Sequence, residues 1–365
     1  MEVMPGALTS RWTVFVPLLA AITLAATWGR SLPGIAVDVV VAALVGAVLA
    51  AVYHVEVIAH RVGQPLGALV LAVAVTVIEV GLIVTMMGTS GEKSAALARD
   101  TVFAAVMITC NGIFGLALLV GAVRRRVAVF NAEGTGAALG TVATLSTLSL
   151  VLPTFTTSKP GPEFSVAQLV FAAVASLSLY VLFVMVQTVR HRDDFLPVEE
   201  PDGASADAGD ELPTVRATVL SLTMLVVALV AVVGLAKVVS PSVESVVASA
   251  GLPQSAVGVV IALLVLLPET VAAVRAAHRG QVQISLNLAL GSAMASIGLT
   301  IPVIAVATIW LDGPLVLGLG ATQMVLLALT VVVGVLTVVP GRATLLQGGV
   351  HVALFFAFVF LAASP

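Results

Sequence analysis

Two glutamates lie deep inside apolar runs of the sequence, where a charged side chain is costly. Glu79 is the fourteenth residue of the run 66–87, and Glu269 is the fifteenth residue of the run 255–277. A charge near the middle of a membrane helix costs roughly 2.5–3.5 kcal/mol on insertion scales, and such groups usually mark ion or proton pathways. One such acid alone can be a hydrogen-bonded structural residue, but two at matching depth predict a shared site for cations and protons.

Oxygen-bearing side chains accompany both glutamates, and hard cations prefer carboxylate, hydroxyl and carbonyl ligands. Thr76 precedes Glu79 by one helical turn, so both side chains face the same way. Hydroxyls also recur at four-residue spacing in the run 284–308, as Ser292, Ser296 and Thr300. The expected metal ligands are Glu79, Glu269, Thr76, Asn111, Ser292 and Ser296, and the two glutamates are also expected to carry the protons.

Two further features near these residues each have two interpretations. Pro268 comes directly before Glu269 and removes a backbone donor, so it either kinks the helix or frees the carbonyl near Leu264 for a cation. Gly112 and Gly115 follow Asn111, and they either serve close helix packing alone or belong to the small, polar face of the expected site. Both pairs of interpretations stay open at the level of the sequence.

Composition places the chain in a membrane. Of its 365 residues 60% are hydrophobic and 10% charged, with a mean hydropathy of +1.17, whereas soluble domains carry roughly 25% charged residues. The net charge of −3 and the lack of a basic stripe exclude nucleic acid as a partner. Cys110 is the single cysteine, which excludes an intrachain disulfide and a CxxC site. None of the histidines is expected to be a ligand, since His54, His60, His191 and His278 fall in loops or at span edges and His351 falls in the last helix.

Breaks in hydropathy divide the chain into eleven apolar segments, and about 20 residues of helix cross the hydrocarbon layer. The first segment is expected to remain as a span, because no small-residue cleavage signature follows it. Eleven Lys and Arg residues lie on the side of the N-terminus against five opposite, which predicts a cytoplasmic N-terminus and an external C-terminus in the cell (inner) membrane. The expected spans are 12–28, 33–53, 66–87, 100–122, 136–152, 164–189, 214–239, 255–277, 284–308, 314–338 and 344–363.

A hydrophilic stretch, 190–213, holds eight of the nineteen acids and is expected to be a cytoplasmic linker, either a solvated tether or a regulatory segment. It separates five spans in 33–189 from five in 214–365, after one extra helix in 1–32. Two related units with an odd number of spans must enter the bilayer from opposite faces. The expected fold is therefore an all-α integral membrane protein with two inverted five-helix repeats.

Two pairs of sequence stretches resemble the calcium/cation antiporter superfamily, and within it the bacterial calcium(sodium):proton antiporters of the ChaA type. Leu-Leu-Pro-Glu-Thr-Val-Ala-Ala (266–273) and the stretch Asn-Leu-Ala-Leu-Gly-Ser-Ala-Met-Ala-Ser-Ile-Gly-Leu-Thr-Ile-Pro (287–302) are similar to the second α-repeat of that superfamily. Ala-Val-Thr-Val-Ile-Glu-Val-Gly-Leu-Ile-Val (74–84) and Ile-Thr-Cys-Asn-Gly-Ile-Phe-Gly (108–115) match the first repeat more loosely. The two repeats to which these stretches belong cover about a quarter of the chain.

The resemblance implies that Glu79 and Glu269 bind cation and proton, with carbonyls and polar groups of the four repeat helices completing the shell. It also implies that Asn111 corresponds to the asparagine of the first repeat. The plant and fungal calcium:proton exchangers have Gly-Asn-x-x-Glu in both repeats, whereas this chain has Val75-Thr76 and Val265-Leu266 in place of Gly-Asn. The resemblance therefore leaves the number of ligands, and with it the choice among calcium, sodium and potassium, open.

The expected mechanism is competition for one site. Two carboxylates in a low-dielectric cavity repel each other and are poorly solvated, so the site favours protons when the cation leaves. The loaded or protonated site can reorient while the bare dianion cannot, which predicts exchange of cytoplasmic Ca²⁺, or alternatively Na⁺, for external H⁺ across the bilayer. The transported cation is the substrate, and no cofactor is expected.

Two rival functions follow from the same residues. A sodium- or potassium-coupled exchanger shares the fold and both glutamates. An intramembrane hydrolase with a carboxylate dyad is disfavoured, because no aspartate lies deep in a span and no Gly-x-Gly-Asp stretch occurs. The sequence has no G-x-x-x-x-G-K-[ST] phosphate loop for ATP, and a passive channel would be blocked by tightly binding carboxylates.

Overall fold

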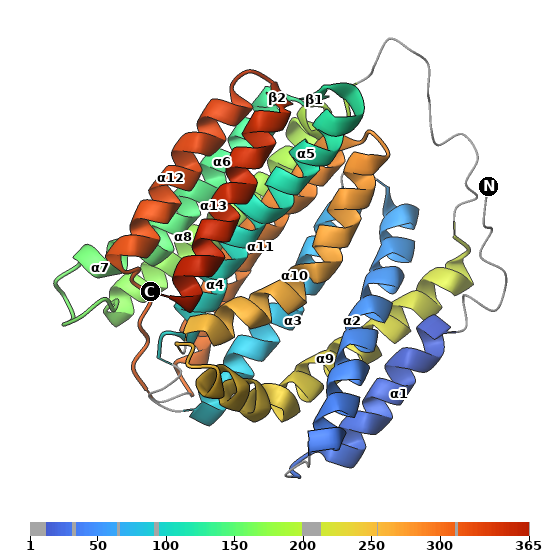
Figure 1. Ribbon diagram of the computed structural model, residues 1–365, viewed down its shortest axis with the longest axis vertical. Coiled ribbons are helices and arrows are strands. Elements are labelled where there is room, and N and C mark those ends of the chain that lie inside the picture. The colour runs from blue at the N-terminus through green and yellow to red at the C-terminus, as the bar shows by residue number, and fades with distance from the viewer. Residues whose placement is uncertain are drawn as a thin grey trace.

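Long apolar helices form nearly the whole chain in the computed structural model (Figure 1), which describes residues 12–30, 34–63, 66–90, 95–198, 213–253, 255–310 and 313–364. The helices before the linker are α1 (Trp12–Thr27), α2 (Gly34–Val62), α3 (Leu66–Ser90), α4 (Leu97–Met107), η2 (Ile108–Ile113), α5 (Phe114–Arg125), α6 (Ala132–Ser146), η3 (Thr147–Val151), α7 (Leu152–Phe155), α8 (Val166–Met185), η4 (Val186–Arg190) and η5 (Arg192–Phe195). Those after it are α9 (Val215–Ser249), α10 (Ser255–His278), α11 (Val282–Ala307), α12 (Ala321–Val338) and α13 (Leu345–Ala363).

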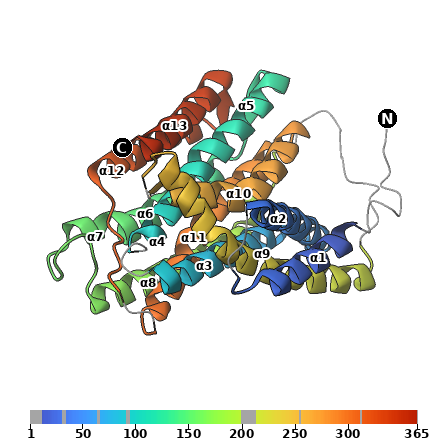
Figure 2. The same ribbon diagram turned by 60° about the horizontal axis from the view of Figure 1, so that its bottom comes forward.

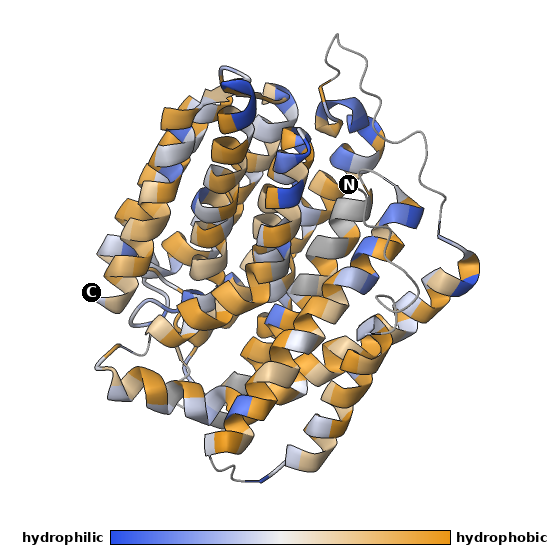
Figure 3. Cartoon of the chain, turned by 45° about the vertical axis from the view of Figure 1, so that its right-hand side comes forward, coloured by the Kyte–Doolittle hydropathy of each residue, from blue (hydrophilic) through white to orange (hydrophobic). Residues whose placement is uncertain are grey.

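The chain is an all-α membrane protein apart from one short pair of strands. Eight helices of the described residues are long and apolar enough to cross a membrane, and α10, which is bent, makes nine. α1 has 16 residues and falls short of the length that crosses a bilayer without thinning it. Hydrophobic residues cover most of each helix, and hydrophilic residues gather toward the helix ends (Figure 3). The count of eleven spans stays a prediction.

Several expected boundaries are wrong. α2 continues to Val62 because no glycine or proline lies between its expected end at 53 and Gly63, whose φ of +80° ends the helix. α9 likewise continues to Ser249 with Pro241 inside it. α12 begins at 321 instead of 314, since the glycine- and proline-containing segment 313–320 is irregular, and at the start of α12 the Gly320 backbone nitrogen donates a hydrogen bond to Oε1 of Gln323 at 2.9 Å.

One element was not anticipated. The three-residue strands β1 (Val127–Val129) and β2 (Arg342–Thr344) pair antiparallel, with Ala128 opposite Ala343. β1 follows α5 and β2 precedes α13, so the strand pair joins these two helices at one end of the bundle (Figure 1). Each strand has three residues, which is too few for an alternation of apolar and polar residues to be recognised in the sequence.

The helices form a central group with a further group on each side (Figures 1 and 2). α1, α2 and α9 pack on one another at one side, while α6, α8, α12 and α13 lie at the other. Between them α11 contacts α3, α6, α8 and α10, and the segment 97–125 contacts α10, α11 and α13. The apolar part of the 97–125 segment is 89% buried against 17% for α13, so the segment that carries Asn111 lies in the middle of the molecule.

The linker is anchored where it begins. Asn287 on α11 donates a hydrogen bond from Nδ2 to the carbonyl oxygen of Phe195, at 2.6 Å, and the Phe195 ring is buried against Phe183. Phe195 is therefore docked on the helices, while residues 190–193 and 197–198 on either side of this anchor are exposed. The remainder of that linker, 199–212, lies outside the described residues, as does most of its acidic charge.

Candidate cation site

The two glutamates converge on one helix. Ser296 of α11 donates a hydrogen bond to Glu79 of α3, with its Oγ 2.6 Å from both Oε1 and Oε2. Ser292, one turn earlier on α11, donates to Oε1 of Glu269 on α10 at 2.9 Å. Both carboxylates are buried, with Glu79 2% exposed and Glu269 0% exposed. The sequence-predicted serines thus lie directly beside the sequence-predicted acids.

The four-residue spacing of the serines explains this arrangement. Residues four apart in an α-helix share a face and are separated by about 6 Å along the axis, so Ser292 and Ser296 meet two different helices at adjacent levels. A Cβ at Gly298 would lie 2.6 Å from the Cβ of Tyr180 on α8. Close helix approach at Gly298 therefore packs α11 against α8, while its serine hydroxyls face α10 and α3.

The acids have oxygen donors as neighbours and no cationic side chain. Among the described residues the ion pairs involve other acids, such as Asp100 and Glu163. Oε2 of Glu269 is fully buried and has no hydrogen-bond partner in the described part of the chain. An ionised oxygen that is buried without a partner is unfavourable, and a proton or a cation at this oxygen would remove the penalty.

The donor set is that of a hard cation. Within the described residues no group of three or more His, Cys, Asp and Glu side chains comes together. The site therefore offers two carboxylates and hydroxyls, without the sulfur and imidazole ligands that select zinc or copper. Thr76 is also buried, 2% exposed, and lies on α3 one turn before Glu79.

The helix that carries Glu269 is bent at the residue before it. The angle between the two parts of this helix, Ala256–Leu267 and Glu269–His278, is 48°. The bend follows from Pro268, whose ring nitrogen cannot donate to the preceding turn. The kink interpretation of this proline therefore holds, and the use of the Leu264 carbonyl as a ligand stays a prediction.

Asn111 lies in a different polar cluster. Its Nδ2 donates to Oγ1 of Thr330 on α12 at 2.9 Å, and its Oδ1 is 3.2 Å from Nδ1 of His351 on α13. It sits in the π-helical turn η2 and is fully buried. In the described residues its hydrogen bonds are directed at α12 and α13 instead of at the two glutamates.

Two histidines are buried, and the expected placement of His54 at a span edge is wrong, whereas the expectation that no histidine is a ligand stays a prediction. His351 is 1% exposed and takes part in the cluster around Asn111. His54 lies inside α2, is 2% exposed, and donates from Nε2 to the carbonyl oxygen of Thr13 on α1 at 2.9 Å. Both were recognisable as ionisable residues within or next to apolar runs, which is the signal that identified the glutamates.

The glycines next to Asn111 serve close packing. A Cβ at Gly112 would lie 3.2 Å from the Phe355 ring, and one at Gly115 would lie 2.8 Å from Cβ of His351. A Cβ at Gly348 would lie 2.9 Å from the backbone nitrogen of Leu119. These three glycines let α13 pack directly against the backbone of η2 and α5, as the packing interpretation of Gly112 and Gly115 requires.

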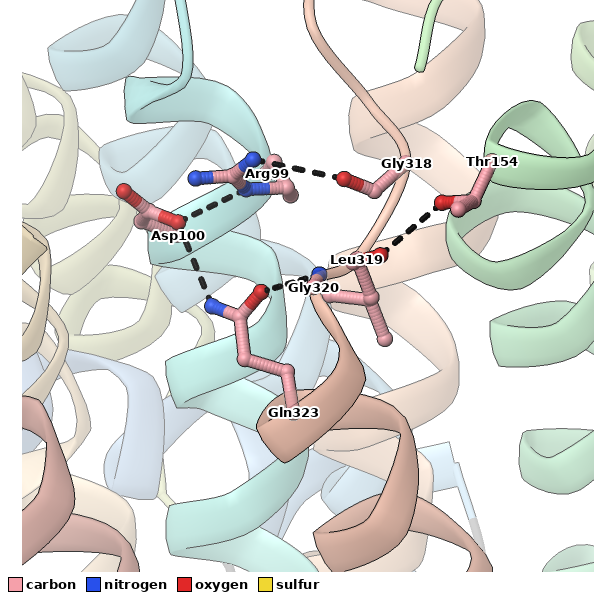
Figure 4. A network of polar contacts seen from close by, with 7 residues as sticks. All are labelled: Arg99, Asp100, Thr154, Gly318, Leu319, Gly320 and Gln323. Atoms are coloured by element: carbon pink, nitrogen blue, oxygen red, sulfur yellow. Dashed lines mark hydrogen bonds and ion pairs between the residues drawn. The ribbon is translucent and has the colours of Figure 1, made fainter. Parts of the chain in front are cut away.

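A polar network closes the end of the molecule away from the strands (Figure 4). Oδ1 of Asp100 accepts from Nε of Arg99 at 2.8 Å and from Nε2 of Gln323 at 3.4 Å. Arg99 also donates to the carbonyl oxygen of Gly318, and Thr154 donates to that of Leu319 at 2.9 Å. The network ties α4 and α7 to the irregular segment that leads into α12.

Comparison with known proteins identifies the family. A model of the sodium/calcium exchanger protein family matches residues 34–189 and 220–363. The chain belongs to this family. It is therefore an antiporter of the calcium/cation antiporter superfamily, a transporter of ions and not an enzyme, as the resemblance implied.

Two relatives are similar over nearly the whole chain. y4hA of Sinorhizobium fredii, named as a candidate ionic transporter, is 46% identical over 97% of this chain and 96% of its own length. The sodium-potassium/proton antiporter ChaA of Escherichia coli is 32% identical over 95% of this chain and 94% of its own length. Among solved structures, the H⁺/Ca²⁺ exchanger CAX superposes with a TM-score of 0.70 at 17% identity, covering 97% of this chain and 91% of that one.

Proposed function

We propose that this antiporter exchanges Ca²⁺ for H⁺, with Glu79 and Glu269 as one site shared by the cation and the protons. The observation that carries the proposal is the convergence of both buried carboxylates on Ser292 and Ser296 of α11. The relatives support proton coupling, because ChaA is named a proton antiporter and CAX a H⁺/Ca²⁺ exchanger.

The physical basis of the exchange is charge neutralisation. An empty site with two ionised carboxylates in a low-dielectric environment is unfavourable, so either two protons or one divalent cation must occupy it. The orphaned Oε2 of Glu269 marks where a proton or a cation adds without displacing a hydrogen bond. Only neutralised forms of the site then reorient between the two sides of the membrane, which couples the two fluxes.

The arrangement of helices supports two inverted repeats. The matched residues form two blocks, 34–189 and 220–363, on either side of the linker. The glutamate-bearing α3 packs on α11 of the second block, and α10 packs on the 97–125 segment of the first. In this proposal α2 to η4 form one repeat, α9 to α13 form the other, and α1 is an additional helix.

We also propose that the N-terminus is cytoplasmic in the cell membrane and the C-terminus external. The arginines near α5, the α10–α11 turn and β2 support this orientation, because they gather at the end of the bundle where β1 and β2 pair. An ion pair joins Glu56 and Arg275, whose charged atoms are 3.8 Å apart. It lies toward the C-terminal ends of α2 and α10. An excess of basic residues is typical of the cytoplasmic side.

A monovalent cation is the second candidate. ChaA is named a sodium-potassium/proton antiporter, and it is more similar in sequence to this chain than CAX is. The two Gly-Asn pairs of the plant and fungal exchangers are also absent here, which leaves fewer oxygen ligands than a Ca²⁺ ion usually takes.

Reconstituted vesicles separate these candidates. A pH gradient is imposed on proteoliposomes, and its dissipation is followed with a pH-sensitive dye after addition of Ca²⁺, Na⁺ or K⁺. We expect Ca²⁺ to dissipate the gradient at the lowest concentration. Dissipation by Na⁺ or K⁺ alone would replace the Ca²⁺ assignment with the monovalent one, and no response to any of the three would refute proton-coupled exchange.

A further inference from the structure

A second buried polar cluster lies beside the proposed cation site. It joins Asn111 of η2, Thr330 and Thr337 of α12, and His351 of α13, all 2% exposed or less. Nδ1 of His351 is 3.2 Å from Oδ1 of Asn111, and Nε2 is 3.2 Å from Oγ1 of Thr337. The exchange mechanism proposed above uses none of these four side chains.

The direction of each hydrogen bond in this cluster can be assigned in turn, starting from the Thr330 hydroxyl. The Thr330 hydroxyl donates to the carbonyl oxygen of Leu326 at 2.8 Å, so its oxygen accepts from the amide nitrogen of Asn111. The amide oxygen of Asn111 therefore faces His351 and needs a donor, which places the imidazole proton on Nδ1. Nε2 then accepts from the Thr337 hydroxyl, and the neutral Nδ1–H tautomer satisfies every member of the cluster.

The element that His351 contacts is a π-helical turn. η2 departs from α-helical geometry over Ile108–Ile113, and such turns are rare and usually need support from their surroundings. α13 reaches this turn because Gly112 and Gly115 leave room for Phe355 and His351. On its other sides η2 contacts α10 and α11.

We propose that His351 is a positioning residue of the antiporter: its Nδ1–H holds the Asn111 carboxamide, and with it the π-helical turn 108–113, against α10 and α11. Those two helices carry Glu269, Ser292 and Ser296, so the turn is the physical connection between His351 and the cation site. The inference rests on the proposed function, because the property that His351 sets is the affinity of that site for its cation. His351 itself contacts neither cation nor carboxylate.

Three substitutions separate positioning from simple packing. The side-chain amide of His351→Asn places its nitrogen near the position of Nδ1, and that of His351→Gln places its nitrogen near the position of Nε2. His351→Leu has no nitrogen at either position. We expect His351→Asn to keep the apparent KM for the cation within about threefold of wild type. We expect His351→Gln and His351→Leu to raise it by about tenfold, the loss that one buried hydrogen bond produces. Thr337→Val, which removes only the Nε2 partner, is the matched control and should resemble His351→Asn.

The outcomes also separate this inference from the proposed function. Wild-type vesicles that exchange no cation for protons would refute the proposed function. Active wild-type vesicles with equal KM values in His351→Asn, His351→Gln and His351→Leu would refute the positioning role alone. Equal loss in all three variants would likewise refute it, since packing at position 351 would then be the only requirement.

The tautomer can also be measured directly in the wild-type protein. Solid-state ¹⁵N NMR of the full-length protein with labelled histidine reports which imidazole nitrogen carries the proton, and the resonance missing from His351→Asn assigns His351. We expect a protonated Nδ1 and a bare Nε2. An Nε2–H tautomer or an imidazolium would overturn the inference, even if the Gln and Leu variants failed to fold.

Discussion

The hydroxyl of Ser296 lies 2.6 Å from both carboxylate oxygens of Glu79, although the two residues are 217 positions apart in the chain. Through this contact α11 holds α3, and through Ser292 the same helix holds α10. α11 is thus the element on which the acids of both halves of the chain meet. The following predictions test its consequences.

Removing the serine hydroxyls should weaken cation binding. Ser296→Ala takes away a hydrogen bond to a buried carboxylate, which contributes about 1.5–3 kcal/mol. We expect the apparent KM for the transported cation in vesicles to rise at least about tenfold, since 1.4 kcal/mol is a factor of ten. Ser292→Ala should have a smaller effect, because Ser292 contacts one oxygen of Glu269.

Ser285→Ala is the matched control for both serines. Ser285 is buried on the same helix, and its hydroxyl donates to the carbonyl oxygen of Ala273 on α10 at 2.8 Å. We expect its KM to stay near the wild-type value. An equal rise in all three variants would mean that the serines act through helix packing and not through the carboxylates.

The contact between α13 and α5 should tolerate no side chain at Gly115. A Cβ there would lie 2.8 Å from Cβ of His351 and 3.0 Å from the backbone nitrogen of Val352, which cannot rotate away. Overpacking of this kind costs about 1–3 kcal/mol. We expect Gly115→Ala to lower the melting temperature of the purified protein by several degrees.

Gly140→Ala provides the comparison for Gly115. Nothing lies within 4 Å of a Cβ at Gly140, which is also inside a helix. Alanine is favoured over glycine in a helix by about 1 kcal/mol, so the melting temperature should not fall. Equal melting temperatures for Gly115→Ala and wild type would show that α13 does not approach α5 this closely.

The proposed orientation can be tested by labelling single cysteines. Cys110 is the only cysteine and is 3% exposed, so Cys110→Ala provides a background without thiols. In that background Ser158→Cys lies in the exposed segment before α8, and Arg190→Cys lies at the exposed end of η4. We expect an impermeant maleimide to label Ser158→Cys on intact cells and Arg190→Cys only after permeabilisation. The opposite pattern would reverse the orientation.

The acids and the hydroxyl stripe were predictable because they depend on short-range rules. A glutamate in the middle of an apolar run is expensive wherever the helix packs, and serines at four-residue spacing share a helix face in any fold. Both observations hold before any helix is placed. The same is true of the bend at Pro268, which follows from its missing donor.

The partners of Asn111 were not predictable, because they depend on which helices become neighbours. Thr330 and His351 come from α12 and α13, and periodicity does not report contacts between helices more than 200 residues apart. The π-helical turn has no sequence signature either. His351, in contrast, was visible as an ionisable residue in an apolar run, and the rule that identified Glu79 and Glu269 applies to it as well.

Proton release on cation binding tests the shared site most directly. Purified protein in weakly buffered solution is titrated with Ca²⁺, Na⁺ or K⁺, and the released protons are counted with a pH-sensitive dye. Glu79→Gln and Glu269→Gln each remove one of the carboxylates, while Glu133→Gln, at the exposed start of α6, is the control. We predict proton release from wild type and Glu133→Gln, and none from Glu79→Gln or Glu269→Gln. Undiminished release from either of the last two would contradict a site in which both glutamates hold the cation and the protons in turn.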